Sequence, residues 1–310
     1  MSGAVGSRGV RLVLGFSPGS LSDHIARILR DALAEQLGAP VTIELRPGRN
    51  GIPAARDVAA SAPDGATLFM ATLGTHAIAP YLSENMPYDP LRDFTCVSLV
   101  SRSPMLLACH PSVGVNSVGE LIDRAGSGEL TYATSATGGA PHLAAELFQK
   151  LAGVTMRHVR YDQTEMLYRD LEAGRVALSF NNIISMLPRC RSGKLRALGV
   201  SSNERSAIAP DVPTIAEAGV AGYEMSNWVG IAGPCGMPEA TTNRLSAAVA
   251  TAVRSEHVSA ELLAQGIIPC GGTAQEFASF ILGETEKWRP IVAQLHGVTA
   301  QKQFGAADKR

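Results

Sequence analysis

Residues 10–45 read VRLVLGFSPGSLSDHIARILRDALAEQLGAPVTIEL, and this stretch indicates the fold class. Residues 10–15 form a short apolar run that is typical of a strand. Residues 22–37 repeat apolar side chains at helical spacing, and Gly38 is the expected C-cap because glycine adopts the left-handed conformation that ends helices. A second apolar run at residues 41–45 completes a strand–helix–strand unit, the building block of parallel sheets.

The same alternation continues along the rest of the chain. A helix at residues 52–62 and a strand at residues 67–72 extend the first set of elements. A second set is predicted with strands at residues 130–133, 155–159, 176–180 and 195–200 and helices at residues 141–151 and 164–172. Residues 238–295 are predicted to be mostly helical. The pattern therefore predicts an α/β protein.

Two extended apolar stretches, at residues 97–109 and 225–233, connect the two sets of elements. We interpret them as crossover strands between two lobes, each with a central, mostly parallel sheet flanked by helices. Lobe one would contain residues 1–102 and 229–310, and lobe two residues 103–228, with a ligand cleft between them. A double crossover of this kind is typical of hinge-and-cleft proteins.

The composition excludes several classes of protein. Of the 310 residues, 45% are hydrophobic and 18% are charged, which provides a large core and excludes wholesale disorder. The formal net charge of -1 lacks the basic surplus of a nucleic-acid-binding protein, so no nucleic-acid partner is expected. No apolar run approaches the roughly 20 residues of a membrane helix. Residues 1–9 lack the apolar segment of a secretory signal, which fits either a cytosolic protein or the mature part of an exported one.

No metal or cofactor is expected. The 5 cysteines form no Cys-x-x-Cys pair, and we interpret them as small buried apolar side chains. The 7 histidines form no His-x-x-x-His pattern that would hold zinc on a helix. The phosphate-binding P-loop is absent, and no G-x-G-x-x-G follows a strand.

Two loops of small residues precede helices at corresponding places in the two sets. Residues 17–26 align with residues 135–144 at a constant offset of 118 residues, and both segments enter a helix with a histidine near its first turn. A helix N-terminus leaves backbone N–H groups unpaired and carries partial positive charge, and a small-residue loop lets an anion approach these donors. We therefore expect two facing anion sites, with tight turns of no binding role as the alternative.

Two further polar segments follow strands at the same edge of the sheets, where ligands of open α/β sheets bind. Thr72, Thr75 and His76 add hydroxyl groups and an imidazole after the third strand of the first set. His76 has an alternative role as a structural cap. Asn181 and Asn182 follow the strand at residues 176–180, where paired amides orient a polar ligand or cap the next helix.

One motif requires an enzyme to be considered. Residues 15–19, GFSPG, match the G-x-S-x-G nucleophile elbow of hydrolases, which would make Ser17 a nucleophile. The residue after that serine donates an oxyanion-hole N–H group, and Pro18 has none. A serine hydrolase is therefore the least favoured alternative, and we expect no enzyme. We interpret Asp23 as a carboxylate stabilised by the start of its helix.

A set of short strings, in order along residues 10–292, resembles one family. They are FSPGSLSD at residues 16–23, RPG at 46–48, APDG at 62–65, PYDPLRDF at 87–94, PHLAAELF at 141–148, GKLRAL at 193–198, DVPT at 211–214 and EAG at 217–219. In these strings the chain resembles the substrate-binding receptors of tripartite tricarboxylate transporters, the Bug or TctC-type family.

This resemblance implies a periplasmic solute-binding protein of type II-like fold, a Venus flytrap whose two lobes close on a small carboxylate. It also implies delivery of the ligand to membrane permease subunits, export as a precursor, and no catalysis. We expect a monomer that binds a small organic mono- or dicarboxylate, with a cytosolic small-molecule sensor of the same fold as the alternative. The residues expected to bind the ligand are Phe16, Ser17, Pro18, Gly19, Ser20, Thr72, Thr75, His76, Ser135, Ala136, Thr137, Gly138 and Asn181.

Two departures from the family pattern bear on the ligand. Ser20 and Leu21 stand where the family commonly has glycine or another small residue, so Leu21 is expected to narrow the pocket or add apolar contact. Asn181 stands where the family often has an aspartate that pairs with the ammonium group of amino acids. Because Asn181 is neutral, we expect a plain carboxylate rather than an amino acid.

Overall fold

The N-terminal strand–helix–strand unit consists of β1 (Val10–Leu14), α1 (Leu21–Leu37) and β2 (Val41–Leu45). It belongs to a computed structural model that describes residues 9–82, 86–128, 130–135 and 138–305. Ser20 is the N-cap of α1, and Gly38 ends the helix in the left-handed conformation, with φ of 63°. The predicted helix and its glycine C-cap are confirmed, because the apolar spacing and the cap residue agree on the same boundaries.

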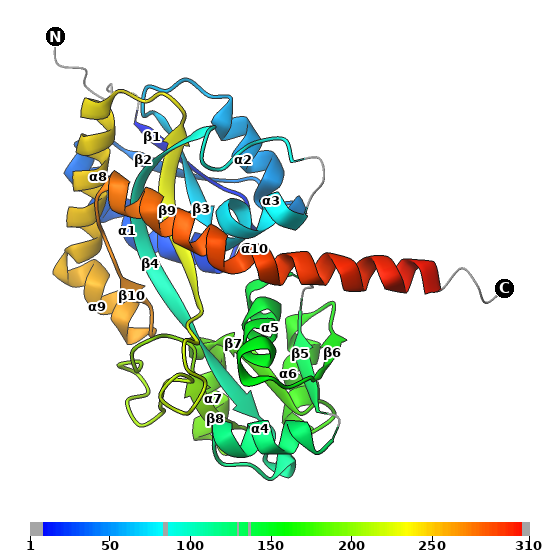
Figure 1. Ribbon diagram of the computed structural model, residues 1–310. Helices are drawn as coiled ribbons and strands as arrows, with labels where there is room; N and C mark the ends of the chain where they lie inside the picture. The colour runs from blue at the N-terminus through cyan, green and yellow to red at the C-terminus, as the bar shows by residue number, and fades with distance from the viewer. Residues whose placement is uncertain (1–8, 83–85, 129, 136–137, 306–310) are drawn as a thin grey trace. The chain divides into compact units, whose positions relative to one another are not determined.

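The chain divides into two compact units, which we call the first unit (Met1–Arg102 with Trp228–Arg310) and the second unit (Ser103–Asn227). The chain passes from one unit to the other twice, within strands β4 (Phe94–Cys109) and β9 (Ser226–Pro234). Figure 1 shows both strands.

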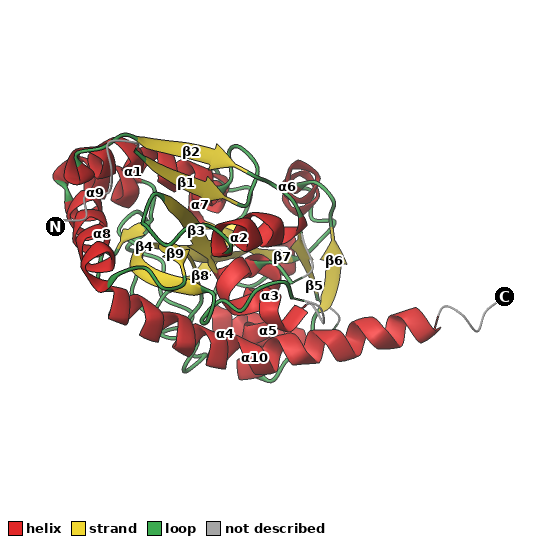
Figure 2. Ribbon diagram, turned by 90° about the horizontal axis from the view of Figure 1, so that it is seen from above, coloured by secondary structure: helices red, strands yellow, loops and turns green. Residues whose placement is uncertain are grey.

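The sheet of the first unit has the strand order β2–β1–β3–β9–β4, with β3 at Thr67–Thr72. β1 is parallel to β2 and to β3, while β9 is antiparallel to β3. Figure 2 shows β2 and β1 side by side. The short strand β10 (Ile268–Pro269) is antiparallel to β4. The crossover strands therefore add antiparallel pairs to a parallel centre.

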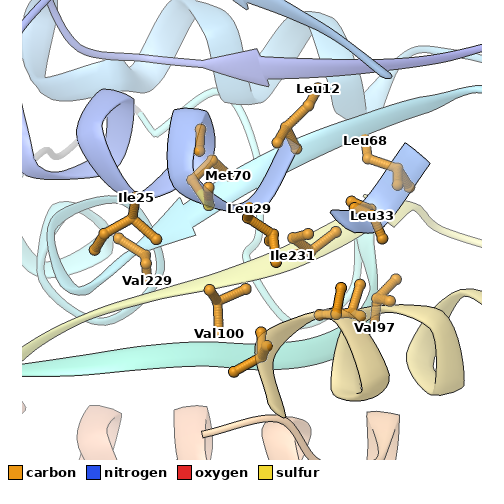
Figure 3. Packing of buried hydrophobic residues seen from close by; sticks show 14 of the residues in the cluster. Leu12, Ile25, Leu29, Leu33, Leu68, Met70, Val97, Val100, Val229 and Ile231 are labelled. Atoms are coloured by element: carbon orange, nitrogen blue, oxygen red, sulfur yellow. The ribbon is translucent and has the colours of Figure 1, made fainter. Parts of the chain in front are cut away.

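One face of this sheet is packed against helices α1, α8 (Glu239–Arg254) and α9 (Glu256–Ala264). Alternate strand residues point to this face, as the two-residue period of a strand requires. Figure 3 shows the cluster, in which the buried strand and helix side chains include Leu12, Leu68, Met70, Val229, Ile231, Ile25, Leu29 and Leu33. Burial of each such side chain stabilises the fold by about 1.5–3 kcal/mol.

The first unit is completed by short helices and by the C-terminal helix. These elements are η1 (Arg49–Gly51), α2 (Ile52–Ala59), the π-helical turn η2 (Gly74–Ile78), α3 (Ala79–Leu82) and α10 (Ala274–Gly305). α10 packs against η2 and α3. Its Phe277 ring lies so close to β9 that a Cβ on Gly230 would lie 2.2 Å from the ring, so this strand position requires glycine.

The second unit has the strand order β8–β4–β7–β5–β6. Its strands besides β4 are β5 (Thr131–Thr134), β6 (Arg157–Arg160), β7 (Leu178–Asn182) and β8 (Arg196–Val200). β5 is parallel to β6 and β7, and β4 is antiparallel to β7 and β8. Its helices are η3 (Pro111–Val113), α4 (Val118–Gly126), α5 (Ala140–Ala152), α6 (Thr164–Glu172) and α7 (Ile183–Arg191).

Helix α4 was not predicted, although the sequence carries a signal for it. Ser117 is its N-cap, and the Ser117 hydroxyl accepts a hydrogen bond from the Glu120 backbone N–H group at 3.1 Å. A serine followed three residues later by glutamate is a capping-box pattern that marks helix starts.

The cysteine interpretation was also incomplete, because Cys109 is buried whereas Cys235 is exposed.

Candidate functional site

Three loops that leave β1, β2 and β3 pack against one another in the first unit. A Cβ on Gly15 would lie 2.4 Å from the Cα of Gly51, so the loop after β1 touches the loop after β2 backbone to backbone. A Cβ on Gly51 would lie 2.9 Å from the Thr75 Cγ2 atom, which belongs to the loop after β3. Glycine is therefore required at both positions because any side chain would push the three loops apart.

The Phe16 ring lies over this junction. It is half-buried, and its edge lies 3.5 Å from the position of a Cβ on Gly51 and 3.9 Å from that of a Cβ on Gly74. The structure thus brings Phe16 together with the segment that contains Thr72 and Thr75. Ser17, Pro18 and Gly19 follow as an exposed loop.

Two backbone N–H groups of the first loop are already hydrogen-bonded within the protein. Gly19, with φ of 78°, donates its N–H group to the Asp23 Oδ2 atom at 2.8 Å. The Ser20 N–H group donates to the Ser17 carbonyl at 3.1 Å, and the Ser20 hydroxyl accepts from the Asp23 N–H group at 3.3 Å. The Gly19 amide is therefore already paired within the protein, because a carboxylate in the first turn of α1 reaches back to it.

The donors that remain in the first loop belong to the helix itself. Leu21 and Ser22 are the first two residues of α1, and within the described residues their N–H groups have no acceptor. The Asp23 carboxylate is 3% exposed, and its Oδ1 atom accepts from Arg27 Nε at 2.8 Å. The Arg27 charge balances the carboxylate at the start of α1.

The third loop lies inside the protein rather than on its surface. Thr72 and Thr75 are 6% and 0% exposed, and their hydroxyls and amides bond each other at 3.0–3.2 Å. The His76 ring is fully buried against Phe69, Tyr88 and Phe94. We expected His76 to touch the ligand, but in this conformation it reaches only the Thr75 hydroxyl, through Nδ1 at 3.0 Å.

Burial also sets the protonation state of His76. It lowers the His76 pKa to about 3, so the ring is neutral at physiological pH. The Nε2 atom has no hydrogen-bond partner among the described residues. The rings of Phe69, Tyr88 and Phe94 surround the imidazole and make apolar contacts with it.

In the second unit, the predicted loop follows β5. Ser135 and Gly138 are half-buried, and Gly138 has φ of 75°. Ala136 and Thr137 lie outside the described residues. The N–H group of Gly138 donates to the His142 Nδ1 atom at 2.9 Å. Gly139 is the N-cap of α5, and no side chain caps this helix.

The two loops therefore contain the same arrangement. In each, a left-handed glycine directly precedes the N-cap and donates its N–H group to the third helical residue, four positions later. The corresponding pairs are Gly19 with Asp23 and Gly138 with His142, so the structural offset is 119 residues. The sequence alignment at an offset of 118 was wrong by one residue, because it matched the two histidines rather than the two helix starts.

His142 lies in a layer of stacked rings. It is 4% exposed, and its ring centroid lies 4.2 Å from that of His158 and 6.0 Å from that of Tyr132. Its Nε2 atom lies 3.6 Å from the Glu146 Oε1 atom, which accepts the Tyr132 hydroxyl at 2.5 Å. Burial lowers the His142 pKa to about 4.

Asn181 lies on β7, which pairs with β5, the strand that leads into this loop. In this parallel pairing, Ala133 is opposite Ser179. Asn181 is 6% exposed, and its Nδ2 atom has only a long hydrogen bond to Ser179 Oγ, at 3.5 Å. The Asn182 side chain does not cap α7, so the capping alternative does not hold for it.

The expected ligand residues include no lysine or arginine. The chemistry that these loops offer is therefore that of backbone N–H groups, hydroxyls and one amide, which suits a carboxylate held by neutral donors. Among the described residues, no three histidine, cysteine or acidic side chains gather as a metal site would require. In the described part of the chain, no helix is both long and apolar enough to cross a bilayer.

A separate hollow lies elsewhere in the second unit. Its volume is about 450 Å³, and Cys190, Arg191, Arg196 and Asp211 are among its lining residues. None of the expected ligand residues that the structure describes lines it. Both arginines already donate to backbone carbonyls, Arg191 to Ile208 and Arg196 to Val115.

Three groups at the loops were missing from the predicted site. They are Asp23, Gly51 and His142, which stabilise the conformation of the loops. They do not offer a surface for ligand contact. The sequence contains a signal for two of them, since each follows a loop glycine by four residues and carries an acceptor side chain. Gly51 has no comparable signal, because its role depends on contact with Gly15.

The family now follows from comparison with known proteins. The chain belongs to the TctC family, the tripartite tricarboxylate transporter family receptors, whose sequence profile matches residues 25–296. Members of this family are solute-binding receptors of transporters and not enzymes, so the serine hydrolase alternative falls away. The fold is the α/β fold of type II periplasmic binding proteins.

Individual relatives cover nearly the whole chain. Protein BugT of Bordetella pertussis is 32% identical over 291 residues, 93% of this chain and 89% of BugT. The structure of R. palustris Rpa4515 with adipate is 35% identical, with a TM-score of 0.80, over 94% of this chain and 98% of that one. MatC from Rhodopseudomonas palustris, with bound malate, is 31% identical, with a TM-score of 0.76, over 92% and 99% of the two chains.

Proposed function

We propose that this protein is a periplasmic receptor that binds a small organic mono- or dicarboxylate between its two units and delivers it to the permease subunits of a tripartite transporter. The observation that carries this proposal is the repeated loop arrangement in a chain of this receptor family. Each unit has a left-handed glycine followed by helix-start amides for which the described residues provide no acceptor, at Leu21 and Ser22 in α1 and at Ala140 in α5.

The class of ligand follows from the donors. Backbone amides and neutral hydroxyls stabilise a carboxylate without a lysine or arginine. Relatives that share 35% and 31% of the sequence have structures with adipate and with malate, which are both dicarboxylates. Asn181 offers no negative charge to an ammonium group, which favours acids over amino acids.

Titration calorimetry against a panel of ligands tests the proposal. We expect adipate, malate or a related dicarboxylate to bind with a dissociation constant in the micromolar range or below. Aspartate, which has an ammonium group in place of the hydroxyl of malate, should bind at least about tenfold more weakly than malate, since an unmatched buried charge costs more than about 1.4 kcal/mol. Preferential binding of an amino acid would contradict the proposed ligand class. A failure of every small carboxylate to bind would contradict the function.

A further inference from the structure

We propose that His142 is a positioning residue of the binding site, whose imidazole Nδ1 atom holds the Gly138 amide at the entry to α5. This inference rests on the proposed function, since the loop matters only where it receives a ligand. His142 does not itself reach the ligand, because its ring is 4% exposed and packs against the rings of Tyr132 and His158.

The hydrogen bond fixes the point at which the loop turns into the helix. Gly138 adopts φ of 75°, and its N–H group donates to His142 Nδ1 at 2.9 Å. Without an acceptor at this place, a partly buried amide is left unsatisfied, and the loop gains freedom. The helix-start amide of Ala140, which would meet a ligand, follows two residues later, so its direction depends on this bond.

The first unit supports the same requirement through different chemistry. There the acceptor is the Asp23 carboxylate, at 2.8 Å from the Gly19 nitrogen and at the same helical position. Two side chains as different as aspartate and histidine share only the ability to accept a hydrogen bond at this position. The acceptor is therefore the feature that both loops need.

The bond also defines the tautomer of His142. Because Nδ1 accepts, the proton of the neutral ring lies on Nε2, which faces Glu146 Oε1 at 3.6 Å. The titratable groups that face the ring are Glu146 on α5, Tyr132 on β5 and His158 on β6. Protonation would turn Nδ1 from an acceptor into a donor. Two N–H groups would then face each other, and the hydrogen bond from Gly138 would be lost.

A neutral acceptor has an electrostatic consequence for the ligand. In the first unit the Asp23 carboxylate lies in the first turn of α1 and offsets the positive end of that helix, with Arg27 as its partner. The first turn of α5 contains no acidic residue, so the positive end of this helix stays available to an anion. Histidine thus holds the loop without repelling a carboxylate.

Two substitutions distinguish the role of the hydrogen-bond acceptor from that of the imidazole ring. His142→Asn keeps an oxygen acceptor near the place of Nδ1, whereas His142→Gln places its amide near Nε2 and removes the acceptor beside Gly138. With adipate as the probe, we expect His142→Asn to bind within about threefold of the unmodified protein. We expect His142→Gln to bind about tenfold more weakly or worse, as an unsatisfied amide implies. Equal affinities of the two variants would overturn the proposal.

A measurement without ligand separates this inference from the proposed function. We expect hydrogen exchange of the Gly138 amide to be faster in His142→Gln than in the unmodified protein and to remain slow in His142→Asn. Unchanged exchange in the glutamine variant would overturn the positioning role even if adipate binds. If the unmodified protein binds none of the acids, the proposed function fails, while the exchange result still decides the role of His142.

Discussion

At the scale of single residues, the loops that we propose to bind the ligand depend on glycines with two different roles. Gly15 permits a backbone approach, since a Cβ there would lie 2.4 Å from Gly51 Cα. Gly19 has nothing within 4 Å of its missing Cβ, so it is needed for its left-handed φ of 78° and not for space. A side chain on Gly19 would therefore point into open surroundings, which makes this position suitable for testing the site.

We predict that Gly19→Asp abolishes carboxylate binding while the protein stays folded. The new carboxylate would precede the helix-start amides of Leu21 and Ser22 by only two and three residues and would repel an anion there. Gly19→Asn is the matched control, because asparagine has nearly the same shape as aspartate but no charge. Both residues have the same modest strain, about 1 kcal/mol, in a left-handed conformation. Calorimetry with adipate should show binding in the asparagine variant only. Equal affinity in both variants would exclude this loop from the site.

The buried histidines predict how stability depends on pH. The folded-state pKa of His76 is about 3 and that of His142 about 4, both below the ordinary value of 6.5. Below pH 6.5 the unfolded chain binds protons that the folded protein does not, so the free energy of unfolding falls as the pH falls. The expected slope is up to about 1.4 kcal/mol per pH unit for each histidine.

Urea unfolding between pH 6.5 and pH 5 measures this slope in a range above the titration of most carboxylates. His76→Phe keeps an aromatic ring in the cluster. It should reduce the pH dependence of the free energy of unfolding by the contribution of one histidine. An identical slope in the variant and the unmodified protein would show that His76 does not resist protonation.

At the scale of elements, α10 is joined to β9 by a buried carboxylate. Glu284 on α10 is 6% exposed and accepts from Trp228 Nε1 and Trp288 Nε1, both at 3.0 Å. Lys287 Nζ lies 2.7 Å from its other oxygen. Trp228 is the first residue of the first unit after the chain returns through β9, so this contact anchors the strand where it enters the unit.

We predict that Glu284→Ala destabilises the protein by about 2–4 kcal/mol, because it removes the acceptor of two indole N–H groups and the partner of a lysine. Glu286→Ala is the control on the same helix, since Glu286 is exposed, and it should change stability by less than about 0.5 kcal/mol. Thermal unfolding followed by circular dichroism compares the two. Similar midpoints in both variants would contradict an anchoring role for Glu284.

At the scale of the whole molecule, the chain enters and leaves the second unit through β4 and β9. Two such connections allow a rotation of one unit against the other with few changes in backbone angles. Under the proposed function, we expect a ligand that contacts both units to stabilise a closed arrangement by the contacts it makes only there. Family membership and the repeated loops are the basis for this expectation.

We predict that a bound dicarboxylate lowers the radius of gyration measured by small-angle X-ray scattering and raises the thermal midpoint. At a ligand concentration of 100 times the dissociation constant, the added stability should be about 2.7 kcal/mol. Gly19→Asp, which should not bind, is the control for unspecific effects of the acid. An unchanged radius at saturation would show that binding does not close the units.

Much of this architecture could be predicted from the sequence. The strands β2 and β3 and the helix α6 have the predicted boundaries, and the family assignment is confirmed by a profile over residues 25–296. These features are local, because apolar periodicity and cap residues act over one or two helical turns. The crossover strands were also recognised, although their antiparallel pairing depends on strands distant in the sequence.

The composition of the candidate site was less predictable from the sequence, and His76 and Gly19 show why. The sequence places both at the carboxyl ends of strands, where a ligand is expected. Only the packing of Phe69, Tyr88 and Phe94 turns His76 inward, and only the reach of Asp23 occupies the Gly19 amide. No local pattern contains these distances.

The sequence by itself determined most of the strands and helices in their order, the two loops before α1 and α5, and the receptor family. The tertiary structure decided which amides stay free, which side chains are buried, and that Asp23 and His142 perform the same task. The physical reason is that local conformation follows from neighbours along the chain, whereas hydrogen-bond partners and burial follow from residues that meet only when the chain is folded.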